Sequence, residues 1–263
     1  MRNAQERDGS ALAGGGWRAF LRATGGGICS CWRLEAGGWR LLRLAAMPED
    51  PIVAAEGIAV RRPGALILRE VSLELRSGEA VGLFGANGSG KTTLLRVLAT
   101  LTRPSSGGGT VLGAPLGTDA VERVRPRIAL VAHDPALVAN LTLGENLRLL
   151  ALLAGRSVDD ATRSLEAVGL SGASGRRASV CSNGMRRRAE FARVMLATPD
   201  LLLLDEAHVG LDPAAGDLVA HIVESVTGRG GGVVIVSHER ERVGGLIDRS
   251  LTLADGRITE AGR

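Results

Sequence analysis

The sequence predicts an α/β fold built on a mostly parallel sheet, and three segments support this prediction. Each is a short apolar run that ends in small or polar residues, as buried strands do: Ala80–Phe84, Leu201–Leu204 and Val233–Val236. The first run is followed by a glycine-rich turn and then by a helical pattern from Lys91 to Thr100. Strands buried on both faces are typical of parallel sheets covered by helices. A chain of 263 residues can form one such core.

Residues 1–46 differ in composition from the rest of the chain. They hold all three tryptophans, two glycine triplets, and seven arginines against three acidic residues, which accounts for the net charge of +4. Arginines interrupt every apolar stretch, so no signal-peptide core is present. We interpret 1–46 as a disordered leader or an over-extended start, with Met47 as the alternative first residue. The remaining residues, 47–263, form the expected domain, and their neutral charge argues against nucleic acid as a partner.

The body begins with patterns typical of strands and turns. Strands are expected at Ile52–Arg61 and Val71–Leu75, and we assign them to an antiparallel β subdomain. Proline, serine and three glycines predict a loop at 103–109, and Ile128–Val131 predicts another strand. At the other end of the chain, Asp255-Gly256 predicts the turn of a closing hairpin.

The glycine-rich turn matches the phosphate-binding loop pattern, in which two glycines separated by four residues precede lysine and a hydroxyl residue. Glycines allow successive backbone N–H groups to face inward, and the following helix adds the positive end of its dipole. Lys91 can reach the β- and γ-phosphates of a nucleotide, and the Thr92 hydroxyl can ligate Mg²⁺. A chance match is the alternative, but Lys91 is the only lysine in the chain. The expected nucleotide-binding residues are Gly85, Ala86, Asn87, Gly88, Ser89, Gly90, Lys91, Thr92 and Thr93.

A helical insert is expected at about 140–195. Thr142 and Glu145 form a capping-box pattern, which predicts a helix from Leu143 to Leu153, and Ser157 should cap a further helix that ends near Gly169. Neither helix is long enough to span a membrane. The insert leads to the segment Cys181–Arg188, whose triple arginine Arg186–Arg188 predicts a solvated helix face, with a contact to phosphate or to a membrane subunit as the alternative.

Two of the apolar runs end in residues with catalytic chemistry. Asp205 and Glu206 follow one run and His238 follows another, and strand ends of a parallel sheet meet at the edge where the phosphate loop also lies. Asp205 is the expected Mg²⁺ ligand beside Thr92, and Glu206 is the expected base that activates water. Solvated acids and a packed core histidine are the alternatives for these positions.

From Ile52 to Thr259 these motifs, in this order, resemble the ATP-binding subunit of ATP-binding-cassette (ABC) transporters. The resemblance implies ATP and Mg²⁺ as cofactors, with His238 as the switch histidine and Asp212 in the D-loop. Ser182, Asn183 and Gly184 lie at the signature position, which binds the γ-phosphate held by a second ATPase subunit. The family further implies a two-fold pair of ATPase subunits, a separate membrane permease subunit, and a peripheral location on the cytoplasmic side of the membrane.

Within this family, three stretches resemble the haem-exporter ATPase of cytochrome c maturation. They are 131–147, 182–188 and Asp205–His208. His133 stands where most members have glutamine, and we assign it to the catalytic set, acting through water or by tracking the γ-phosphate rather than on Mg²⁺ directly. A passive loop residue is the alternative. The chain has no tyrosine to stack on adenine, and Arg61 or Arg62 is a candidate substitute.

Three other functions remain open at this stage. The nearest is the ATPase subunit of another ABC exporter, for a drug, a lipid or a polysaccharide. A soluble ATP-dependent switch is more remote, because neither a second cassette nor a coiled-coil insert is visible. The third is a scaffold that binds ATP and hardly hydrolyses it, a possibility raised by His133.

Overall fold

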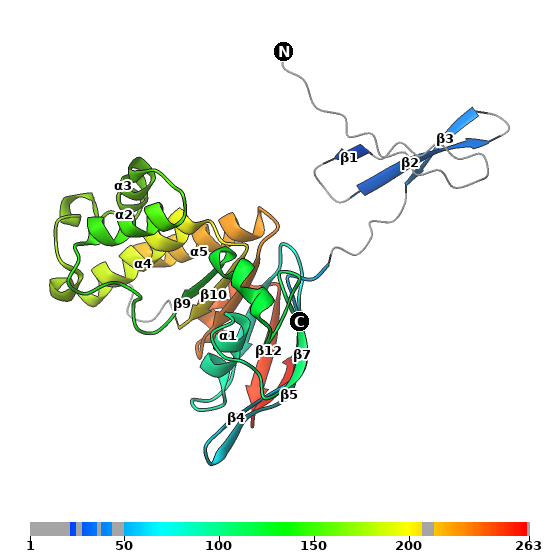
Figure 1. Ribbon diagram of the computed structural model, residues 1–263, viewed down its shortest axis with the longest axis horizontal. Coiled ribbons are helices and arrows are strands. Elements are labelled where there is room, and N and C mark those ends of the chain that lie inside the picture. Colours follow the sequence, from blue (N-terminus) through cyan, green and yellow to red (C-terminus); the bar gives the residue numbers. More distant parts are fainter. Residues whose placement is uncertain (1–21, 25–27, 36–37, 44–49, 207–212, 262–263) are drawn as a thin grey trace. The chain divides into compact units, whose positions relative to one another are not determined.

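The computed structural model describes residues 22–24, 28–35, 38–43, 50–206 and 213–261 (Figure 1). The chain divides into two compact units, Met1–Glu49 and Asp50–Arg263. In the first unit, three antiparallel strands form a sheet in the order β1-β2-β3. They are β1 (Arg22–Thr24), β2 (Ile28–Glu35) and β3 (Gly38–Arg43). That residues 1–46 contribute nothing to the packing of the body stays a prediction.

The second unit contains a six-stranded sheet in the order β13-β12-β6-β11-β10-β9. All neighbouring strands are parallel except β12 and β13, the C-terminal hairpin. The strands are β6 (Ala80–Phe84), β9 (Ile128–Val131), β10 (Leu201–Asp205), β11 (Gly232–Val236), β12 (Arg249–Ala254) and β13 (Arg257–Ala261). Every residue of β6, β10 and β11 is buried, as their apolar sequences require. The predicted mostly parallel sheet is confirmed.

A four-stranded antiparallel sheet, in the order β5-β4-β7-β8, forms the predicted β subdomain. Its strands are β4 (Val53–Arg62), β5 (Ala65–Leu75), β7 (Ser106–Val111) and β8 (Ala114–Pro115). Strand β7 corrects the prediction of a loop through residue 109. Its glycines allow close pairing with β4, since a Cβ atom at Gly109 would lie 1.9 Å from the carbonyl oxygen of Ala54.

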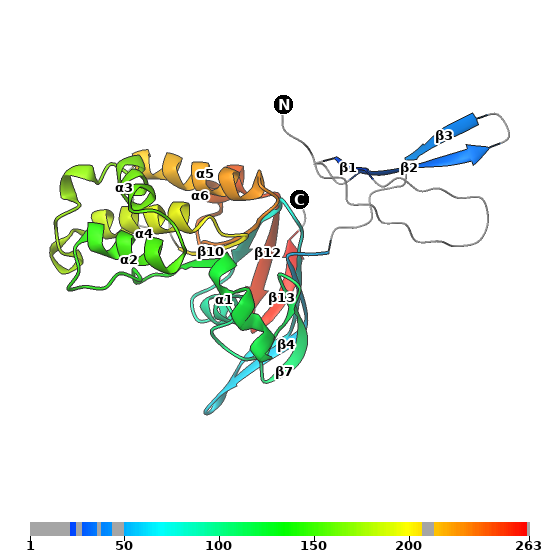
Figure 2. The ribbon, with the colours of Figure 1, turned by 45° about the horizontal axis from the view of Figure 1, so that its top comes forward.

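Six α-helices are present in the described part of the body. They are α1 (Lys91–Leu98), α2 (Leu143–Leu153), α3 (Val158–Ala167), α4 (Asn183–Ala197), α5 (Pro213–Thr227) and α6 (Arg240–Val243). The predicted capping box of α2 is formed at Thr142, and Ser157 is the N-cap of α3 as predicted, there too within a capping box. Figures 1 and 2 show α2, α3 and α4 together in one helical region, while α1 lies beside the sheets. Among the described residues, no helix combines the length and apolar character needed to cross a bilayer.

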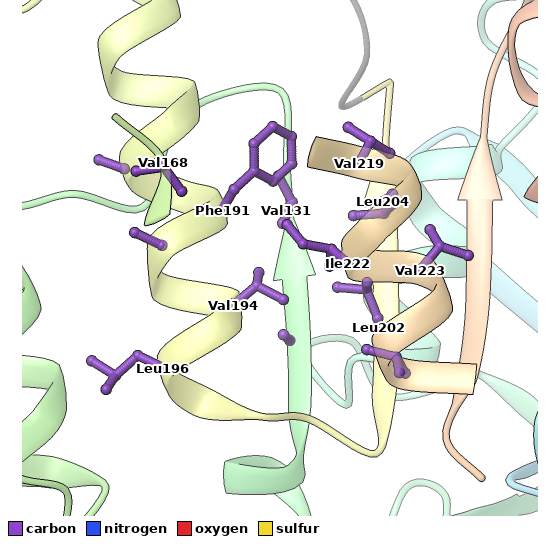
Figure 3. Close-up of a cluster of buried hydrophobic side chains, with 14 of the residues drawn as sticks. Val131, Val168, Phe191, Val194, Leu196, Leu202, Leu204, Val219, Ile222 and Val223 are labelled. Atoms are coloured by element: carbon purple, nitrogen blue, oxygen red, sulfur yellow. The ribbon is translucent and has the colours of Figure 1, made fainter. Parts of the chain in front are cut away.

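An apolar cluster fixes α4 and α5 against the sheet (Figure 3). Phe191 and Val194 of α4 pack with Ile222 of α5 and with Leu202 and Leu204 of β10. Phe191 is 1% exposed, and replacing such a residue with alanine costs about 3–5 kcal/mol of stability. The cluster therefore sets the position of α4 relative to the strand that ends in Asp205.

Candidate functional site

The phosphate loop joins β6 to α1, and its backbone requires glycine. Gly85, Gly88 and Gly90 have φ angles of 149°, 80° and 107°, which disfavour other residues. At Gly85 a Cβ atom would lie only 2.2 Å from the carbonyl oxygen of Leu253. No side chain caps the start of α1, so the first N–H groups of this helix remain available to an anion.

Two polar groups in this loop lie where a phosphate could bind them, one hydrogen-bonded to the loop itself and one unpaired. Lys91 is 6% exposed, and its Nζ atom donates to the carbonyl oxygens of Gly85 (2.8 Å) and Ala86 (2.9 Å). The Ser89 hydroxyl oxygen is buried and has no hydrogen-bond partner. Because buried polar atoms are normally paired, the loop fits a bound nucleotide phosphate.

Asp205 ends β10 beside the start of α1. Its carboxylate accepts a hydrogen bond from the Thr92 side chain, and electrostatic interactions with Lys91 and His133 also favour its charged form. Burial nevertheless raises the pKa of Asp205 above its usual value, and the neighbouring Glu206 raises it further. A bound cation would relieve this cost. Thr92 and Asp205 thus offer two oxygens of the kind that Mg²⁺ binds together with phosphate oxygens.

Glu206 and His238 meet at the ends of the adjacent strands β10 and β11. One oxygen of Glu206, Oε1, lies 3.4 Å from Nδ1 of His238. Glu206 has a left-handed φ of 51°, and its N–H donates to the carbonyl of Val236 (3.1 Å). The side chains are 25% and 48% exposed, so both can reach water or a ligand. His238 therefore occupies an open strand edge, in contrast to the packed-core alternative.

The His133 side chain is exposed, and its backbone is held by α4. Arg187 donates to the carbonyl oxygens of Ala132 (2.6 Å) and His133 (3.0 Å). Arg187 is only 7% exposed, so the prediction of a solvated face is wrong for this member of the triple arginine. The sequence did carry a signal, since Arg187 precedes Phe191 and Val194 by four and seven residues, in the apolar stripe of α4.

The expected signature residues form the N-terminal end of α4. Ser182 is the N-cap and accepts from the Met185 N–H (3.2 Å), as predicted, and Asn183 accepts from Arg186. Both ribbon views place α4 with α2 and α3 rather than beside α1, so the signature helix and the phosphate loop belong to different layers (Figure 2). Asp212 and the rest of 207–212 lie outside the described residues.

Within residues 50–84, which lead to the loop, the one aromatic residue is Phe84, and at 4% exposed it is too buried to stack on adenine. Arg61 and Arg62 lie at the exposed end of β4, next to the turn into β5. Their position leaves both guanidinium groups accessible. Whether either of them stacks on a base stays a prediction.

Comparison with known proteins agrees with this geometry. The ABC transporter family matches residues 68–209. A methionine import ATP-binding protein of Cupriavidus necator is 33% identical over 81% of this chain and 65% of its own length. The Nod factor export ATP-binding protein I of Rhizobium johnstonii is 34% identical over 79% of this chain and 68% of its own. A solved ATP-binding subunit of an ABC transporter superposes with a TM-score of 0.74 at 25% identity, covering 80% of this chain and 90% of that one.

The chain spans about two thirds of the length of these curated relatives. The family match, residues 68–209, contains the phosphate loop, helices α2 to α4 and the end of β10.

Proposed function

The chain belongs to the ABC transporter family, and on this premise we propose that it is the ATPase subunit that drives a separate membrane-spanning subunit. ATP is the nucleotide of this family, and Mg²⁺ is its usual companion ion. One observation carries the proposal. Lys91, Thr92, Asp205, Glu206 and His238 meet at the carboxyl edge of three adjacent strands, where each can act on the same γ-phosphate.

Each residue of this edge has a distinct role in the proposed reaction. Residues 85–93 hold the phosphates, while Lys91 exchanges its loop carbonyls for the β- and γ-phosphate oxygens. Thr92 and Asp205 would hold Mg²⁺, which would supply positive charge beside the phosphates. Glu206 accepts a proton from the attacking water, and His238 orients Glu206 and contacts the γ-phosphate. His133 acts on the same water from the loop after β9.

The proposed working unit is a pair of subunits. Ser182, Asn183 and Gly184 lie at a helix N-terminus, which attracts anions, and in the pair they would reach the γ-phosphate on the other subunit. Asp212 would lie between the two sites. Such a pair closes around ATP and opens after hydrolysis, and the permease on the cytoplasmic side of the membrane follows this motion.

We infer that the cargo is haem, exported for cytochrome c maturation. The inference rests on three stretches, at 131–147, 182–188 and 205–208. A second candidate is export of another cargo, such as a drug, a lipid or a polysaccharide. The 34% identity to a protein named for Nod factor export favours this second candidate. Cargo binds the membrane subunit, so these two candidates differ in the partner rather than in the ATPase.

Two measurements test the proposal. The purified full chain should hydrolyse Mg-ATP, and Lys91→Ala should abolish this activity by weakening nucleotide binding. A tagged Glu206→Gln chain should then retain an integral membrane protein when it is purified from membranes in ATP. Haem absorbance in that complex, with loss of cytochrome c when the gene is deleted, supports haem export. A membrane partner without haem supports the second candidate, and ATP binding with only soluble partners contradicts the transporter function.

A further inference from the structure

Helix α4 carries three charged residues at intervals of three, all on the side that faces the sheet. Arg187 is 7% exposed and Glu190 is fully buried, and the Arg193 side chain is 19% exposed. Charged side chains are seldom buried to this degree unless they are paired. The contacts of these three side chains therefore show which part of the protein this face of α4 holds in place.

The two arginines bind the backbone around the end of β9, the edge strand of the six-stranded sheet: Arg193 within the strand and Arg187 just after it. Arg193 donates to the carbonyl oxygen of Leu130 (2.8 Å), and Arg187 donates to that of Ala132 (2.6 Å). Because β9 ends at Val131, Arg193 holds the edge strand itself and Arg187 holds the start of the loop that follows it. Arg187 makes one contact more, to the carbonyl of His133, where the strand has already ended.

The two arginines differ in what balances their charge. Arg193 pairs with Glu190 of its own helix at 3.0 Å and 3.2 Å. Burial lowers the pKa of Arg187, and the negative charges of Glu190, Asp134 and Asp205 oppose this effect. Two of these three acids lie outside α4, one beside His133 and one at the proposed Mg²⁺ site. Arg187 is thus tied, by hydrogen bonds and by charge, to the catalytic edge of the sheet.

The loop after β9 is held at its other end as well. Asn146 of α2 is 8% exposed and accepts from the Val138 N–H (2.7 Å). Its amide also donates to the carbonyls of Val138 (3.1 Å) and Thr142 (2.9 Å). His133 lies at the first of these two anchors, where its side chain is exposed and interacts electrostatically with Asp205. A shift of α4 therefore moves the first anchor and with it the start of the loop.

We propose that Arg187 is a positioning residue that fixes the backbone at His133 and transmits movement of the signature helix α4 to His133. This inference rests on the function proposed above. In the proposed role, Arg187 contacts neither the nucleotide nor the attacking water. It holds two consecutive carbonyls, which a planar guanidinium can do and a lysine ammonium does less well. Through this coupling, a change in the position of the signature helix changes the position of His133 relative to the γ-phosphate of the same subunit.

Four variants of the full chain test this inference: Arg187→Lys, Arg187→Met, His133→Gln and the matched control Arg193→Lys. Arg193→Lys keeps a positive charge beside Glu190, but its shorter side chain weakens the hydrogen bond to the Leu130 carbonyl. It therefore perturbs the contact of α4 with β9 and leaves the contacts of Arg187 intact. The first measurement is hydrogen–deuterium exchange in peptides covering 131–135, which needs no activity. We expect faster exchange in Arg187→Met, an intermediate rate in Arg187→Lys, and the wild-type rate in Arg193→Lys.

The second measurement separates binding from chemistry. In Arg187→Met, the single-turnover hydrolysis rate should fall about tenfold, while the Kd for a fluorescent ATP analogue changes less than about twofold. Adding His133→Gln to Arg187→Met should slow the reaction little further, because both changes act through one group. Arg187→Lys should restore part of the rate.

Several outcomes overturn the inference. Wild-type exchange at 131–135 in Arg187→Met means that Arg187 does not hold the loop. Equal effects in Arg187→Lys and Arg193→Lys mean that both arginines serve only to attach α4. Additive rate losses in the double variant mean that Arg187 and His133 affect the rate independently. If the wild-type chain itself does not bind or hydrolyse ATP, the proposed function fails, and the exchange measurement still decides whether Arg187 holds His133.

Discussion

The Glu206 carboxylate lies 3.4 Å from the His238 imidazole, although 32 positions separate the two residues in the chain. The parallel pairing of β10 with β11 creates this contact, since Asp205 is in register with Val236. Each strand then delivers its next polar residues to the same edge. Both side chains remain partly exposed there, so water can reach them.

Glu206→Gln should preserve ATP binding and slow hydrolysis by about 10²–10⁴-fold, the usual effect of losing a general base. The amide keeps the size of the side chain and its place beside His238, and it cannot accept the proton. Single-turnover rates on purified protein measure this. Glu239→Gln is the control, because Glu239 lies on the other side of the His238 ring, 3.5 Å from Nε2. A Glu206→Gln enzyme at the wild-type rate would remove Glu206 from the role of base.

Asp205→Asn should raise the melting temperature of the nucleotide-free chain. Burial raises the folded-state pKa of Asp205, so above that pKa the folded protein carries a charge it disfavours. For an acid with a raised pKa, stability is lost as pH rises through the folded pKa, and the neutral amide avoids this loss. A gain of about 2–4 °C at pH 7, as about 1 kcal/mol produces in a domain of this size, is expected.

The same Asp205→Asn variant should lose Mg²⁺-dependent hydrolysis, because an amide oxygen is a weaker ligand than a carboxylate. Asp217→Asn, at an exposed position of α5, serves as the control and should change neither property. A lower melting temperature in Asp205→Asn would mean that the hydrogen bond from Thr92 outweighs the burial of the charge.

Local signals explain why so much of this fold was predictable. The pairs Thr142–Glu145 and Ser157–Asp160 place helix starts to the residue, because each cap is complete within four residues. The glycines of the phosphate loop carry backbone conformations that few other residues adopt. Both kinds of signal can be interpreted without knowledge of distant neighbours.

The features that escaped prediction depend on distant neighbours. Strand β7 contains three glycines and forms only because β4 approaches closely enough to pair with it. Arg187 looks like part of a solvated arginine run until the loop after β9 supplies two carbonyls for it. Charge and hydropathy alone therefore assign it to the wrong environment.

Asp160→Asn should destabilise the chain at neutral pH but not in acid. Hydrogen bonds from the Ser157 side chain and backbone lower the pKa of Asp160 to about 2. For an acid with a lowered pKa, the stabilisation is complete above the unfolded value of 3.8 and is lost as pH falls toward about 2. Urea midpoints from pH 7 to pH 3 should show a gap that narrows below pH 4. Asp159→Asn, in the same helical turn, is the control, and a pH-independent gap would contradict the capping role.

The chain that starts at Met47 should melt at the same temperature as the full chain and bind ATP equally well. The body has its own core, in which Val53 and Ala55 of β4 are already buried. Circular dichroism is the suitable measurement, because all the tryptophans lie in residues 1–46. A chain that starts at Gly57 is the control and should melt lower, since it lacks half of β4. A large drop for the Met47 chain would show that the tryptophans contribute to the core.

Glu206→Gln protein should form dimers in Mg-ATP and return to monomers when the nucleotide is removed. In the proposed pair, the nucleotide of one subunit contacts Ser182 of the other, so ATP is itself part of the interface. Slow hydrolysis keeps that interface in place long enough for multi-angle light scattering to give the mass. Ser182→Arg in the Glu206→Gln background should remain monomeric, because a bulky side chain would block the approach of the second subunit while ATP binding to the phosphate loop continues. Dimers of equal stability with and without ATP would point to a different interface, and monomers in ATP would mean that the membrane subunit must bring the pair together.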